Sequence, residues 1–103
     1  MKLWIGVVMF SIRIYGAGSL KDRRQVVRSV LDRMKSHFNA SVADLGPDNI
    51  WDKADLAVSC IGSSAQEMET RVDHICSLLS RLEDDGEFEP LQVAREVFAY
   101  GDL

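Results

Sequence analysis

The chain has 103 residues, of which 47% are hydrophobic and 27% are charged, with a formal net charge of −4 at pH 7. This length fits one domain with one core, and the composition is far from that of disordered chains. The two cysteines form no C-x-x-C pair, which favours reduced thiols in a cytoplasmic protein over a disulfide or metal framework. We therefore expect a single folded cytoplasmic domain over residues 1–103.

An apolar run that follows Lys2 superficially resembles a secretion signal. Arg13 interrupts the run where a cleavage region should be small and neutral, and about a dozen residues are too few to cross a bilayer. The residues from Leu3 to Ile14 are rich in β-branched and aromatic types and are apolar on both alternating faces. They predict a strand in the middle of a sheet and no membrane association.

A helix is predicted after a glycine-bearing loop, from Leu20 to Phe38. Ser19 has the side chain of an N-cap residue, and Asp22 is favourable in the first helical turn. Apolar residues then recur at three- and four-residue spacing and share one face: Val27, Val30, Leu31, Met34 and Phe38. This face should pack on a sheet. Residues 40–46 alternate weakly as a second strand before a turn at Pro47.

The second half of the chain repeats the order of strand, helix and strand. Residues 54–61 predict a third strand, one face of which is more polar than the other. Ser64 and Glu67 then form a capping-box pattern. The helix that follows has an apolar stripe: Met68, Val72, Ile75, Leu79 and Leu82. Residues 88–98 predict the last strand, in which Pro90 lacks an N–H donor and so indicates an edge position.

This order predicts an α+β, ferredoxin-like βαββαβ fold: a four-stranded antiparallel sheet, order 4-1-3-2, with both helices on one face. The other face would be open. The first strand would then expose one of two alternating apolar sets: Leu3, Ile5, Val7 and Met9, or Trp4, Val8, Phe10 and Ile12. Such patches mark interfaces, so we expect a homo-oligomer, most simply a dimer. The alternative is that residues 97–103 cover this face.

Two segments and a tryptophan carry a family resemblance: SLKDRRQVVRSVLDR at 19–33, FNASVAD at 38–44, and Trp51. Here the chain resembles the YlxP-like family of small bacterial proteins, and the match extends over nearly the whole length. The resemblance implies a ferredoxin-like domain of unknown biochemical function, and it does not identify an active site. Genes of this family often lie beside genes for translation and ribosome maturation, which favours an RNA-related role by association. The loop at 16–18 departs from the family pattern, in which a bulkier, proline-containing segment is expected.

Charge is segregated along the chain. Between residues 20 and 38, six Lys or Arg stand against two Asp, a net charge of +4, while the remainder has six basic and fourteen acidic side chains, a net of −8. At about 100° per residue, four of the cations fall on one narrow stripe beside the core face: Lys21, Arg24, Arg28 and Lys35. Arg23 falls nearer the core, so we expect it to bend toward the sheet edge or an acidic neighbour.

The stripe has two interpretations. It is either a solvated helix flank whose charges pair locally, for instance with the acidic run at residues 83–89, or a surface that binds RNA or the ribosome. Four phosphate contacts would make the affinity fall steeply with salt. Against the second interpretation, no stacking aromatics in an RNP-like pattern accompany the stripe.

Catalytic and metal chemistries have little support in the sequence. His37 and His74 lie on different helices without a carboxylate or cysteine at ligand spacing. The Gly16-x-Gly18 loop lacks the spacing of a phosphate-binding P-loop. It also lacks the arginine that acylphosphatases, enzymes of the same fold, need between the first strand and helix. We therefore expect a non-enzymatic binding domain without metal or cofactor.

Overall fold

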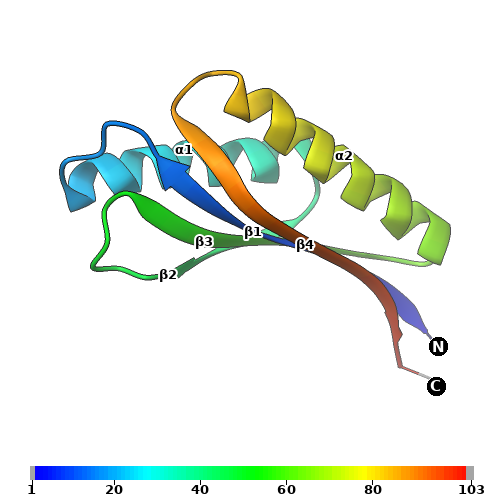
Figure 1. Ribbon diagram of the computed structural model, residues 1–103. Coiled ribbons are helices and arrows are strands. Elements are labelled where there is room, and N and C mark those ends of the chain that lie inside the picture. Colours follow the sequence, from blue (N-terminus) through cyan, green and yellow to red (C-terminus); the bar gives the residue numbers. More distant parts are fainter. Residues whose placement is uncertain (1, 102–103) are drawn as a thin grey trace.

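A computed structural model of the protein describes residues 2–101. Its elements are β1 (Leu3–Ile14), α1 (Leu20–His37), β2 (Ser41–Gly46), β3 (Lys53–Gly62), α2 (Ala65–Glu83) and β4 (Phe88–Tyr100). The four strands form one antiparallel sheet in the order β2-β3-β1-β4, and both helices lie on the same side of it (Figure 1). The predicted ferredoxin-like fold is confirmed, including the central place of the first strand.

The edge strand β4 runs further than predicted, to Tyr100 instead of residue 98. It does so because its last residues pair with the beginning of β1, where Leu3 lies opposite Tyr100. Pro90 lies opposite Ile12, beside a register shift, so its missing N–H falls at an irregular point of an edge strand. The expected alternative, a C-terminal segment folded over the open face, is wrong for residues 97–100, and residues 102 and 103 lie outside the described part.

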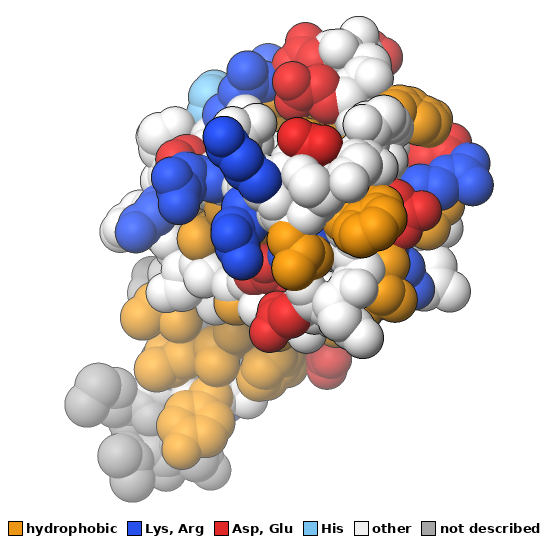
Figure 2. All heavy atoms as spheres, turned by 90° about the vertical axis from the view of Figure 1, so that its left-hand side faces the viewer, with side chains coloured by type: hydrophobic (Ala, Val, Ile, Leu, Met, Phe, Trp, Pro, Cys, Tyr) orange, Lys and Arg blue, Asp and Glu red, His pale blue; other side chains and the backbone are white. Residues whose placement is uncertain are grey.

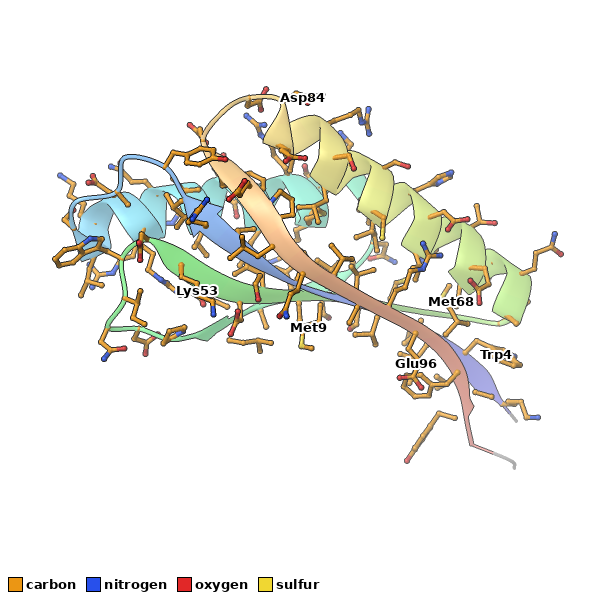
Figure 3. The ribbon with its side chains drawn as sticks, in the orientation of Figure 1. Trp4, Met9, Lys53, Met68, Asp84 and Glu96 are labelled. Carbon is orange, nitrogen blue, oxygen red and sulfur yellow. The ribbon has the colours of Figure 1, made fainter. Side chains whose placement is uncertain are left out.

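The sheet has one covered and one open face, and β1 shows the difference most clearly. Val8, Phe10 and Ile12 are at most 1% exposed and face the helices, whereas Met9 is 48% exposed on the opposite side. Figure 3 shows Met9 directed away from the helices and Met68 of α2 directed toward the sheet. The open set is therefore Leu3, Ile5, Val7 and Met9.

The helices cover the sheet with the apolar stripes that the sequence predicts. The buried residues of α1 and α2 that join the core are Val27, Val30, Met34, Met68, Val72, Ile75, Leu78, Leu79 and Leu82. Ser19 Oγ accepts a hydrogen bond from the Asp22 N–H, and Ser64 Oγ accepts one from the Glu67 N–H, each at 3.1 Å. Both predicted caps are thus present, and they fix where each helix begins.

Helix α2 lies very close to β1 at Gly6. A Cβ atom there would lie 2.8 Å from Cγ2 of Val72 and 3.3 Å from Sγ of Cys60, so any larger residue would push the helix away. Within residues 2–101, neither helix has the length and apolarity that a membrane crossing requires.

Candidate nucleic-acid interface

The predicted basic stripe lies along one flank of α1. Val27, Val30 and Met34 are buried against the sheet, and the stripe runs directly beside this buried face, on the side of the helix toward β2. All four predicted residues are exposed there, and we call them together the basic stripe: Lys21, Arg24, Arg28 and Lys35. Figure 2 looks onto the end of the molecule at which α1 begins, and Lys and Arg side chains gather along one flank of it.

The basic stripe is one continuous surface. Lys21, Arg24 and Arg28 line a shallow hollow of about 410 Å³, and a second hollow of about 300 Å³ is lined by Arg24, Arg28 and Lys35. Since two arginines line both hollows, the four cations adjoin one another. From Lys21 to Lys35 they follow about 21 Å of helix axis, which is long enough to contact several successive phosphates.

The cations of the basic stripe form no close ion pair among the described residues, although Asp32 lines both hollows. Within residues 2–101, none of its four cations has a carboxylate oxygen within 4.0 Å. The acidic run at residues 83–89 does pair with arginines, but with others: Asp85 with Arg33 of α1 at 2.7 Å, and Glu89 with Arg13 of β1. Pairing with this acidic run therefore applies to Arg33 and not to the four residues of the basic stripe.

Arg23 behaves differently although it precedes Arg24 directly. Its side chain is almost completely buried, and its Nε donates a hydrogen bond to the Lys53 carbonyl at 3.0 Å. Nη1 and Nη2 donate to the two carboxylate oxygens of Asp44 at 2.8 and 3.1 Å. This bidentate bond lowers the pKa of Asp44 and raises that of Arg23. The prediction that Arg23 bends toward the sheet edge and an acidic neighbour is confirmed.

Asp44 is the residue that the sequence analysis did not single out. It lies near the end of β2, where the register against β3 shifts between Asp44 and Gly46. Its Oδ1 also accepts a hydrogen bond from the Gly46 N–H at 2.9 Å. The pair ties the first turn of α1 to the edge strand β2 and to the start of β3, and so helps to keep the basic stripe turned outward.

The other candidate chemical groups are dispersed. Cys60 and Cys76 are both free, and burial raises the pKa of the Cys60 thiol, which makes it a poor nucleophile. His37 and His74 are exposed on different helices. In the part of the chain that the structure describes, no three His, Cys, Asp or Glu side chains gather in a way that could hold a metal ion.

Comparisons with known proteins agree with this picture of a small domain without assigned chemistry. Residues 5–95 match the family described as "Protein of unknown function (DUF503)". The "Uncharacterized protein YlxP" of Bacillus subtilis (strain 168) is 28% identical over 75 residues, which cover 73% of this chain and 82% of that protein. Among solved structures, the de novo designed protein Foldit4 is 12% identical, with a TM-score of 0.49 over 100% of both chains.

Proposed function

Because this chain belongs to the DUF503 family of proteins of unknown function, we propose its role from its surface: it binds the phosphate backbone of RNA through the basic stripe, without catalysis. The observation that carries the proposal is four adjoining, exposed cations that have no carboxylate partner within 4.0 Å among residues 2–101, in a chain of net charge −4. The local potential depends on such segregation of charge and not on the total, so a polyanion is attracted to this flank.

The proposed mode of binding is to phosphates and not to bases. Ferredoxin-like RNA-binding domains stack unpaired bases on aromatic side chains of their two central strands. Here the corresponding open-face positions of β1 and β3 hold Val7, Met9, Ala57 and Ser59. None of these can stack a base. A helix flank rich in cations instead suits duplex RNA, which proteins contact mainly through its shape, its phosphates and its 2′-hydroxyls. RNA is preferred to DNA because the family resemblance associates these genes with translation.

The proposal can be tested with a fluorescently labelled RNA hairpin whose stem has about 16 base pairs, the length that one double-stranded RNA-binding domain spans. Fluorescence anisotropy gives the affinity at several salt concentrations. With four phosphate contacts on a duplex stem, the log–log slope of affinity against salt should be about −3.6. In the variant Arg24→Glu/Arg28→Glu, we expect an affinity at least about tenfold lower and a slope near half the original.

A matched control separates the basic stripe from total charge. Lys53→Glu/Arg81→Glu makes the same change in net charge at two exposed cations that lie off the stripe and have no ion-pair partner within 4.0 Å in residues 2–101. This control should bind the hairpin nearly as the wild type does. Equal losses in both variants would mean a diffuse charge effect and would contradict a defined site. Absence of binding at about 50 mM salt would reject RNA binding altogether. If a DNA hairpin of the same sequence bound equally well, the proposed ligand would be nucleic acid in general and not RNA in particular.

A further inference from the structure

We infer that the open face of the sheet is the interface of a symmetric homodimer. Along β1 this face presents Leu3, Ile5, Val7 and Met9, and their cross-strand neighbours continue the apolar surface onto both adjacent strands: Ile61 of β3, and Phe98 and Tyr100 of β4. Met9, Ile61 and Tyr100 are 48%, 63% and 66% exposed. Large apolar side chains grouped on one open face are typical of interaction sites, because leaving them in water is unfavourable.

The size of the face fits a second copy of a chain this small. Strands about 4.8 Å apart, each about ten residues long at 3.4 Å per residue, give four strands a flat area of roughly 650 Å². A stable interface buries about 600–1,000 Å² on each partner. The relief of the side chains increases the flat area further. Packing of two such faces would form the aligned sheet-on-sheet arrangement of a β-sandwich, with a helical layer on each outer side.

The shape of the face is self-complementary. At one end β1 and β4 project as a two-stranded ribbon beyond the helices (Figure 1), carrying Leu3 and Tyr100 on the open side. Toward the other end lies a hollow of about 580 Å³, whose lining includes Met9, Leu45 and Gln92. A two-fold axis near the middle of β1, perpendicular to the strands, places each projecting ribbon over the partner's hollow. The same two-fold rotation then forms both ribbon-to-hollow contacts, as a closed isologous dimer requires.

Charge distinguishes this face from the RNA site. From Leu3 to Ser11 of β1, and at the open-face positions paired with them on β3 and β4, there is no Lys or Arg. The charged side chains there are acidic. Asp55 accepts a hydrogen bond from Ser11 at 2.6 Å, and Glu96 lies on the edge strand, at the rim of the face. The only cations at open-face positions of β1 and β3 in residues 2–101, Arg13 and Lys53, lie at one end of the face, so its middle offers a polyanion no cation. The dimer does not depend on the RNA proposal, since two copies packed in this way leave both basic stripes outward.

The experiment is sedimentation equilibrium of the whole chain and three variants at about 1 to 100 µM. The wild type should approach twice its mass of 11.5 kDa. Met9→Glu places a negative charge from each copy in the apolar interface and should give a monomer, whereas Tyr100→Ala removes a projecting side chain and should weaken the dimer about tenfold or more. Ile50→Glu is the control, because Ile50 is 41% exposed in the turn between β2 and β3. It should dimerise like the wild type.

Circular dichroism of each variant confirms that it is folded, which these exposed positions should permit. If the wild type were monomeric at every concentration, the inference would be overturned, and the open face would have to bind a different partner. A dimer that survives both Met9→Glu and Tyr100→Ala would also overturn it, because association would then use another surface. High salt distinguishes this proposal from the previous one. It should release RNA held by phosphate contacts, yet leave an apolar dimer intact.

Discussion

Arg23 and Arg24 are neighbours on α1, but they lie in two different regions of the molecule. The helix turns by about 100° between them, which carries Arg23 under the edge of the sheet and leaves Arg24 on the outer flank. Arg23 is 3% exposed and bonded to Asp44, while Arg24 is exposed and, in the described part of the chain, has no carboxylate within 4.0 Å. Arginine therefore stabilises the fold on one side of the helix, and on another side it is exposed and available to bind a ligand.

The largest effect is expected from Asp44→Ala. The substitution leaves the guanidinium of Arg23 buried with the Lys53 carbonyl as its remaining partner, and an uncompensated buried charge is strongly unfavourable. We expect the free energy of unfolding to fall by about 3 kcal/mol in urea titrations at pH 7. Asp32→Ala, which removes an exposed carboxylate from α1, is the control and should change stability by less than about 0.5 kcal/mol. Similar losses in both variants would show that the pair contributes little.

A smaller effect is expected from Arg23→Met. This change removes the buried charge together with its need for a partner, and the carboxylate it leaves behind is 31% exposed and can be hydrated. We expect a loss of about 1 kcal/mol by the same titrations, clearly less than for Asp44→Ala. If Arg23→Met proved the more damaging change, packing of the arginine stem, and not its charge, would be what this region requires.

The same variant should alter the dependence of stability on pH. The pKa of Asp44 in the folded protein is lowered, chiefly by the hydrogen bond from Arg23, so the pair stabilises the fold fully above the unfolded pKa of about 3.9. This stabilisation is lost as the pH falls through the folded value. The difference in urea midpoint between wild type and Arg23→Met should therefore narrow from pH 7 to below about pH 4. A difference that stays constant would contradict the ionic role.

The smallest effect on stability is expected from Arg24→Ala and Arg28→Ala. Both side chains are exposed and form no ion pair with any residue that the structure describes, so each change should alter the free energy of unfolding by less than about 0.5 kcal/mol. Each should nevertheless weaken binding of the RNA hairpin and make its salt slope shallower by nearly one. A substantial loss of stability would place these arginines with Arg23, on the structural side of the comparison.

Much of the fold was predictable because its signals are local and periodic. The caps at Ser19 and Ser64, the two apolar helix stripes and the edge position signalled by Pro90 all follow from spacing within a few residues. The exposure of the basic stripe follows from the same periodicity, which places its four cations beside the buried face of the helix and not within it. The periodicity also indicated correctly that Arg23 would turn inward.

Long-range pairing accounts for what was not predicted. Asp44 could not be matched to Arg23 because the irregular register of β2 against β3 decides where its side chain lies. The extra length of β4 depends on partners at the other end of the chain. The open face of β1 was left undecided, although Ser11 and Arg13, which alternate in phase with Met9, were a usable sign that this side is the wetter one.

The place of β1 in the sheet has a consequence for the growing chain. Arg13 pairs with Lys53, 40 positions later, and Leu3 pairs with Tyr100, 97 positions later. At a synthesis rate of about 5–20 residues per second, the first strand to leave the ribosome waits roughly 5–20 s before its final partner exists. During that time a segment that is apolar on both faces has one neighbour at most. Folding is therefore expected to be slow for so small a domain, and the nascent chain, more than the finished protein, should be the form most open to aggregation.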